Sequence, residues 1–191
     1  MGYPSAYGTS NYFFMVRDFP RDDDWLTDEE DLGRCGDSVL CLNSLTPILD
    51  DDAPTAEEMD GKKGWYLGLT TGEQVVTSAI TVFGATTFST HTPTDPRDRA
   101  ACTSDLGTAR VYNVKYANAA PSKPGAENRS AVIVGGGLPP SPVAGKVTLD
   151  DGEVVPFIIG ADGASPLEGG EPEQPFLTTL PKSITYWYIE R

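Results

Sequence analysis

The chain has 191 residues and a net charge of −14 at pH 7, from 28 acidic and 14 basic residues. This length is enough for one domain with a sizeable core, and a hydrophobic fraction of 39 % excludes a fully disordered chain. Nucleic acid and anionic membrane surfaces repel such a chain, and no apolar run is long enough to span a bilayer. We therefore expect no nucleic-acid partner and no membrane span, and we expect cations, calcium above all, as small partners.

In chain order, the first predicted element is a strand at 11–18, which is rich in aromatic and β-branched residues. Residues 18–60, which we call the acidic segment, follow it with 15 acidic residues, two basic ones and a charge of −13. Mutual repulsion opposes packing them into a core, so we predict a partner-facing loop excursion. Deletion of 22–58 is expected to leave the fold intact and to abolish partner binding. The apolar anchors of the segment are Trp25, Leu26, Leu40, Leu42, Leu45 and Ile48.

Two features of the acidic segment are candidates for binding. Asp22, Asp24 and Asp28 could bind calcium, and the alternative is a solvated loop that aids solubility. Trp25 is the best candidate for an exposed binding residue, because the other two tryptophans lie inside predicted strands, where large aromatic side chains usually join the core.

The three cysteines do not form a zinc pattern. Cys35 and Cys41 enclose GDSVL, a spacing that can close a small disulfide loop, with two free thiols as the alternative. Cys102 is left over, and its partner is not defined by this sequence.

From Lys63 onward the chain reads as short strands separated by turns. The predicted strands are 64–69, 78–84, 86–91, 108–116, a short buried strand at 131–134, and 183–190. Gly84-Ala85 and Asp151-Gly152 predict two hairpins, and 63–116 is expected to form a meander of consecutive antiparallel strands. A capping box from Thr55 to Glu58 predicts one helical turn, whereas GGGLPPSP has no regular structure available to it.

This pattern predicts an all-β fold. A β-sandwich, a barrel and part of a propeller each satisfy it, and periodicity alone does not choose among them. The sequence has no clean internal repeat, so the residues themselves do not indicate a complete propeller.

Four stretches, in one order, carry a resemblance to a known family. They are GKKGWYLGLTTGEQVVTSAITVFGATTFSTHTPT from Gly61 onward, ACTSDLGTARVYNVKY, GGGLPPSPVAGKVTLDDGEVVPFIIG and the closing SITYWYIER. Together they resemble the late-propeller region of PilY-type adhesins of the type IV pilus tip, over roughly residues 61–191. None of the stretches is diagnostic by itself. The acidic runs depart from the family's calcium loop, in which acidic residues alternate, so its ligands are not carried over.

The resemblance implies an antiparallel, quinoprotein-like β-propeller, of which this chain would hold the last two to three blades, with a β-sandwich as the alternative. Residues 1–62 would be a strand plus the acidic region, and residues 63–191 the propeller-like region. The implied function is non-enzymatic adhesion and type IV pilus assembly, in the periplasm and at the cell surface. The implied partners are pilin subunits, other pilus-tip proteins, host or environmental surfaces and the remaining propeller blades. That oxidising compartment favours a disulfide between Cys35 and Cys41.

Two other functions remain as alternatives: a calcium-binding structural module and a remnant of a quinoprotein-type propeller enzyme. An enzyme of that fold needs a complete propeller around its cofactor, and 191 residues do not supply one. His91, Ser89 and Asp95 contain the residue types of a hydrolase triad, but nothing resembles a nucleophile elbow. We therefore predict that the chain is not an enzyme and that calcium is its one candidate cofactor.

Overall fold

The computed structural model describes residues 8–18, 24–36, 39–50, 52–82, 84–94, 106–122, 126–150, 152 and 154–160. Helix in these ranges is confined to α1 (Asp28–Asp31) and a short 3-10 turn (Leu42–Ser44), and the rest of the regular structure is β. The predicted all-β class is therefore confirmed, although the described strands close neither a barrel nor a propeller. No described helix has the length and apolar character needed to cross a bilayer. The strand predicted at 183–190 lies outside the described residues.

The first sheet joins three strands in the order β1-β3-β2: β1 (Tyr12–Val16), β2 (Thr46–Ile48) and β3 (Gly64–Gly68). β1 pairs with β3 in antiparallel fashion, whereas β2 pairs with β3 in parallel. Gly64 permits the close approach of β1 and β3, because its φ is +154° and a Cβ there would collide with the carbonyl oxygen of Met15. The boundary expected at residues 62–63 thus lies between strands of a single sheet.

The second sheet has five strands: β4 (Gln74–Val75), β5 (Ile80–Val82), β6 (Ala85–Thr92), β7 (Thr108–Lys115) and β8 (Ser130–Val132). All of its pairings are antiparallel. The hairpin predicted at Gly84 is confirmed between β5 and β6, and the φ of Gly84 is +87°, a turn conformation that glycine adopts without strain. The predicted single meander is wrong in two respects: β3 pairs with β1 and β2 rather than with β4, and β4 and β5 both pair with β6 rather than with each other.

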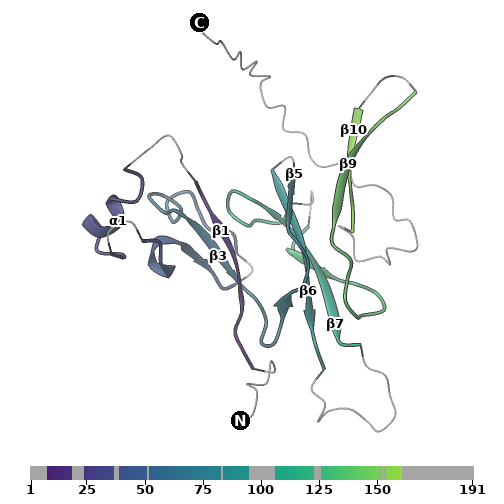
Figure 1. Cartoon of the computed structure of the whole chain (residues 1–191), viewed down its shortest axis with the longest axis horizontal. Helices are drawn as coiled ribbons and strands as arrows, with labels where there is room; N and C mark the ends of the chain where they lie inside the picture. Colours follow the sequence, from purple (N-terminus) through teal and green to yellow (C-terminus); the bar gives the residue numbers. More distant parts are fainter. Residues whose placement is uncertain are drawn as a thin grey trace, which may run out of the picture.

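A two-stranded ribbon, β9 (Val143–Thr148) and β10 (Val154–Ile159), confirms the second predicted hairpin. Figure 1 shows it beyond β6 and β7, on the side away from β1 and β3.

The predicted capping box is also confirmed: the backbone N–H of Thr55 donates to the Glu58 carboxylate at 2.7 Å, and the N–H of Glu58 donates back to the Thr55 hydroxyl at 3.3 Å. The Thr55 N–H lowers the pKa of Glu58 from its usual value.

The main core lies between the two sheets. Trp65 of β3, Phe88 of β6 and Val114 of β7 are completely buried. Phe13 of β1 stacks on Phe88 with ring centroids 3.9 Å apart, and Phe88 stacks in turn on Tyr112 at 4.9 Å. This stack crosses from one sheet to the other, so it fixes how the two sheets pack.

The strand predicted at 131–134 is present only in part and is not buried. β8 ends at Val132, which is 52 % exposed, and Val134 is 73 % exposed. Ile133 alone packs inward, beside Ala109 and Val111. Because β8 is the last strand of its sheet, one side of this apolar run has no neighbouring strand to cover it.

Candidate functional site

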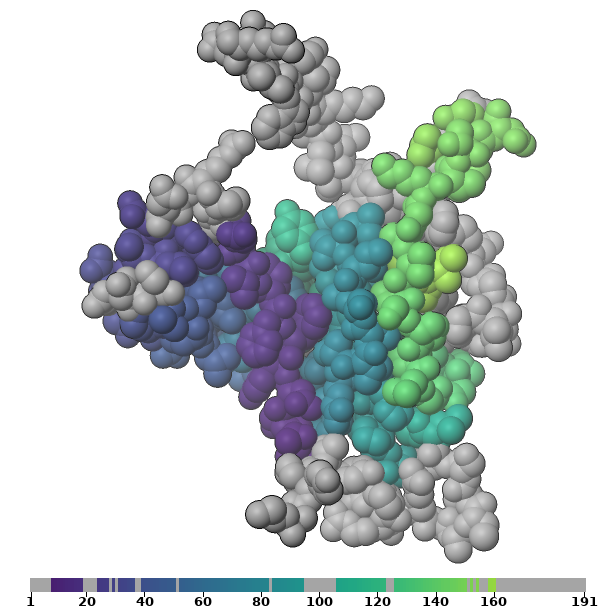
Figure 2. All heavy atoms as spheres, viewed as in Figure 1, coloured from purple at the N-terminus to yellow at the C-terminus, as the bar shows by residue number. Residues whose placement is uncertain are grey.

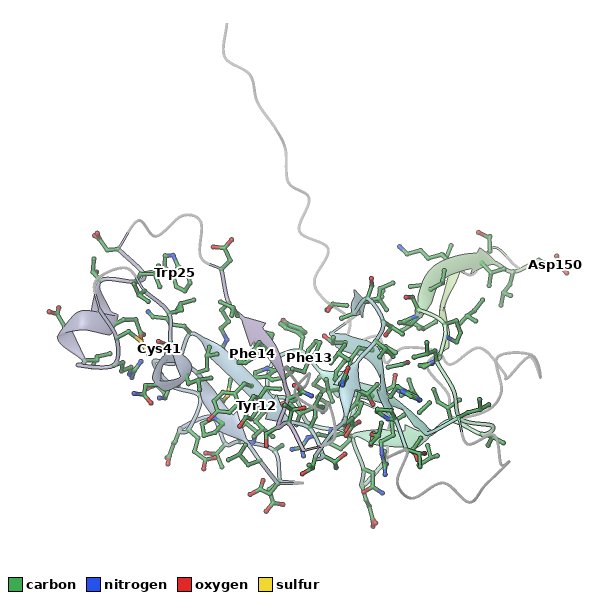
Figure 3. The ribbon with its side chains drawn as sticks, turned by 60° about the horizontal axis from the view of Figure 1, so that its bottom comes forward. Tyr12, Phe13, Phe14, Trp25, Cys41 and Asp150 are labelled. Carbon is green, nitrogen blue, oxygen red and sulfur yellow. A yellow bond between two sulfur atoms is a disulfide. The ribbon has the colours of Figure 1, made fainter. Side chains whose placement is uncertain are left out.

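The outer face of β1 carries a row of exposed apolar side chains. Tyr12, Phe14 and Val16 are 38, 49 and 47 % exposed, whereas Phe13 and Met15 pack against the core. Strand geometry explains this difference, because successive side chains point to opposite faces. Figure 3 labels the three aromatic residues of β1 where this strand runs beside the core.

Tyr66 of β3 extends this row to a second strand. Its ring meets that of Tyr12 edge-on at 5.4 Å and lies 6.1 Å from that of Phe14, its partner in the register. Such contacts orient the rings while leaving apolar area in water, which makes this cluster a candidate recognition surface. We define the aromatic face as Tyr12, Phe14, Val16 and Tyr66.

The backbone edge of β1 is open as well. The N–H of Leu69 donates to the carbonyl of Asn11 at 3.0 Å, and the N–H of Arg17 donates to the carbonyl of Lys63 at 2.8 Å. Antiparallel pairing alternates, so the odd-numbered residues of β1 bond to β3 and the even-numbered ones point their N–H and C=O groups away from it. No hydrogen bond from the described part of the chain reaches these outward groups.

The acidic segment belongs to the folded scaffold, so the predicted loop excursion is wrong. Its residues 46–48 form β2, and Ile48 and Met59 are core residues, 2 % and 6 % exposed. Arg129, just before β8, donates from its guanidinium to the carbonyls of Asp50 and Asp52 at 2.6 Å each. Repulsion does not oppose this packing, because the carboxylates of Asp50 and Asp52 stay exposed while backbone and apolar groups are buried. Deleting 22–58 would therefore remove a strand and core residues rather than a dispensable loop.

Trp25, the predicted binding residue, is half-buried. The Nζ of Lys63 lies 5.6 Å from the centroid of its ring, within the range of a cation–π contact. Trp25 thus packs against the end of the first sheet and does not extend the aromatic face.

Cys35 and Cys41 are joined by a disulfide in the structure, with their Cα atoms 6.1 Å apart. Glu29 is completely buried and pairs with Arg34 at 3.3 Å, and its carbonyl accepts the N–H of Cys35, at the start of the disulfide loop, at 3.3 Å. Arg34 also donates to the carbonyl of Gly61 at 2.6 Å, in the turn that leads to β3. These bonds place the disulfide loop beside the entry to the first sheet.

The predicted calcium ligands are described only in part. Asp22 and the side chain of Asp28 lie outside the described residues, whereas Asp24 is exposed and its carbonyl accepts a hydrogen bond from the Thr27 hydroxyl at 2.6 Å. Among the described side chains, no three His, Cys, Asp or Glu residues gather closely enough to hold a metal ion. Of the three proposed ligands, the described part of the chain therefore offers Asp24 alone, and calcium binding stays a prediction.

The sequence did not predict a second completely buried carboxylate, that of Glu73 between β3 and β4. Its Oε2 accepts the N–H and the hydroxyl of Thr70 at 3.0 and 2.6 Å, and its Oε1 accepts the hydroxyls of Thr90 and Tyr112 at 2.5 and 3.0 Å. Four donors satisfy the two oxygens, so this carboxylate is a structural group. The Thr-x-x-Glu spacing, which is also that of the capping box, predicts the turn but not its burial.

Burial, and then the charge of Glu73, raise the pKa of Tyr112 above its usual value. A phenol with a raised pKa in the folded state stabilises the fold fully below its unfolded pKa of about 10, and this stabilisation is lost as the pH rises further. Between pH 10 and 11 we expect the free energy of unfolding to fall by about 1 kcal/mol more in the native chain than in Tyr112→Phe. Urea unfolding at pH 9, 10 and 11 measures this, with Tyr116→Phe as the exposed control. If the free energy of unfolding changed with pH in the same way for the native chain and Tyr112→Phe, the raised pKa of Tyr112 would be contradicted.

Two polar sites elsewhere have side chains that hydrogen-bond within the chain. A pocket of about 220 Å³ lies beside β7 and β8, but its Asn113 accepts the Thr87 hydroxyl at 2.8 Å and its Arg129 donates to backbone carbonyls. The Nε2 of His91, near the end of β6, lies 2.7 Å from the carbonyl oxygen of Leu106. Asp95, the third member of the imagined triad, is outside the described residues.

The chain matches no protein-family model, no curated protein and no solved structure. The described side chains and the resemblance in sequence are therefore the grounds on which a function is inferred.

Proposed function

We propose that this chain is a non-enzymatic binding module of the type IV pilus, exposed at the cell surface, which acts in pilus assembly and adhesion. The observation that carries the binding role is the aromatic face, where Phe14 is 49 % exposed on a strand whose edge is open. The resemblance to PilY-type adhesins implies the location, which is the periplasm and then the cell surface, and the partners, which are pilus proteins and external surfaces.

The composition of the aromatic face suits recognition. Tyrosine and phenylalanine bring large contact areas with few rotatable bonds, so a partner that covers them loses little side-chain entropy. The rings of Tyr12, Phe14 and Tyr66 already contact one another, with centroids 5.4 to 6.1 Å apart, which restricts them further before binding.

We also propose that the two sheets belong to a propeller-type assembly, whose remaining blades come from a longer form of this chain or from a partner. Two successive sheets that pack face to face through Phe13 and Phe88 support this arrangement.

The test compares the native chain with a double variant, Phe14→Ser with Tyr66→Ser, for co-sedimentation with purified type IV pili and for adhesion of piliated cells. We expect at least a tenfold loss of both, because exposed aromatic anchors dominate binding energy (roughly 2 kcal/mol or more each). The control is Val147→Ser, since Val147 is 44 % exposed on β9, outside the aromatic face. Unchanged binding by the folded double variant would refute the role of the aromatic face. Failure of the native chain to co-sediment with pili would refute the pilus assignment.

A further inference from the structure

We propose that the edge of β1 binds an extended segment of another protein as an added strand, and that this segment is basic, with apolar side chains at alternate positions. The inference rests on the proposed function, because it names the class of partner that the aromatic face would take. Strand addition of this kind draws its affinity from main-chain hydrogen bonds and its specificity from alternate side chains.

β1 lacks the devices that protect the other sheet edges. Among the described edge strands, β2 contains Pro47, β9 contains Lys146 and β10 contains Pro156, while β4, β5 and β8 are only two or three residues long. Proline and lysine on an edge, or a very short edge, discourage pairing with a further strand. β1 is five residues of sequence YFFMV, without proline or charge. Figure 2 shows it (purple) on the visible surface, where no other described strand covers it.

The same residues of β1 offer both kinds of contact. Tyr12, Phe14 and Val16 each point one N–H and one C=O outward from β3, and their side chains form the aromatic face. A strand added here would place every second side chain beside those of Tyr12, Phe14 and Val16, at the distance of a cross-strand pair. Apolar side chains at these alternate positions would therefore cover the aromatic face.

Charge selects the occupant. The acidic segment carries −13 and starts two residues after β1 ends, with the exposed carboxylate of Asp18, whereas Asp50 and Asp52 follow β2 at the opposite edge of the sheet. A basic strand is attracted to such a surface, whereas a second copy of a chain with net charge −14 is repelled. We therefore assign the edge to a basic partner rather than to β1 of another copy.

The first experiment measures amide hydrogen exchange of the full chain with a blocked nine-residue peptide that alternates lysine and valine. We expect the amides of Tyr12, Phe14 and Val16 to exchange at least about tenfold more slowly with saturating peptide, while those of Phe13 and Met15, already bonded to β3, change little. The matched control replaces each lysine of the peptide with glutamate and should give no protection. Peptide binding that leaves the outward amides unprotected would overturn the proposal, because the rings alone would then be the site.

The second experiment separates backbone from side chain with two substitutions at one position. Phe14→Ala removes the ring and keeps the outward N–H, whereas Phe14→Pro removes both without losing a bond to β3. Since the backbone bond is the extra loss, we expect Phe14→Pro to weaken peptide binding at least about fivefold more than Phe14→Ala. Equal affinities for two folded variants contradict strand addition, and if Phe14→Pro does not fold, the exchange measurement decides.

Three further outcomes separate this inference from the function on which it rests and from pairing with a second copy. Pilus binding that depends on Phe14, without any protection of the β1 amides by the basic peptide, would retain the proposed function and overturn the strand. Protection that rises with protein concentration in the absence of peptide, together with a dimer in sedimentation, would assign the edge to a second copy and overturn the basic partner. Protection by the basic peptide in a chain that does not bind pili would retain the strand and refute the pilus assignment.

Discussion

Replacing Phe88 with alanine is expected to lower the free energy of unfolding by about 3–5 kcal/mol, the cost of deleting a large buried ring and leaving a cavity. Phe88 is completely buried, and its ring stacks on Phe13 of the first sheet and Tyr112 of the second. Its removal therefore takes away contacts within the second sheet and contacts between the sheets. For a chain of this size, the melting temperature should fall by roughly 10 °C.

The matched control for Phe88→Ala is Phe14→Ala, which deletes the same ring from a site that is 49 % exposed. That change should cost less than about 1 kcal/mol, because little buried area is lost. Phe88→Leu should fall between the two. Urea unfolding of all three variants measures the difference, and similar losses for Phe88→Ala and Phe14→Ala would mean that the two sheets do not pack through this stack.

Replacing Arg129 with methionine is expected to cost about 3–5 kcal/mol, because it removes a charged donor from one buried and two partly buried hydrogen bonds to carbonyl groups. The guanidinium donates to the carbonyls of Asp50 and Asp52 in the acidic segment at 2.6 Å each, and its Nε donates to that of Ala119 at 2.7 Å. Ala119 ends a turn in which it adopts a φ of +52°, so the same guanidinium also supports a strained residue.

The expected result for Arg129→Met is more specific than a loss of stability. Amides of residues 46–53 should exchange faster, since the acidic segment loses its attachment to the second sheet, while β6 and β7 retain most of their protection. Lys115→Met removes an exposed positive charge from β7 and should change stability by less than about 0.5 kcal/mol. Unaltered exchange in residues 46–53 of a folded Arg129→Met variant would show that β2 pairing alone holds the segment.

The sequence by itself determined the class of the fold and its local turns. Runs of aromatic and β-branched residues predicted β1, β3, β6 and β7, and the glycines at 84 and 152 marked two hairpins. These features depend on neighbouring residues, through φ above zero at a turn and side chains that alternate along a strand, so a sequence contains them directly.

Tertiary structure decided which strands pair. β2 is only three residues long, contains a proline and lies in the acidic segment, so neither its composition nor its charge indicated a strand. It forms because β3 offers a parallel partner and the core accepts Ile48 and Met59. The burial of Glu73 has a similar cause, since two of its donors come from Thr90 and Tyr112, 17 and 39 residues further along the chain. The periodicity of a sequence indicates which side chains share one face of a helix or strand, but it does not indicate contacts with residues far along the chain.

The candidate site illustrates the same limit. Every residue of YFFMV is apolar, so alternation along β1 does not tell which side chains are buried. Phe13 is partly buried because Phe88 of a different sheet stacks on it, and this contact leaves Phe14 on the opposite face, where the described chain places no sheet. Whether an apolar side chain joins the core or stays on the surface depends on what packs against it. For β1, packing of the second sheet against one face determines which side chains are covered.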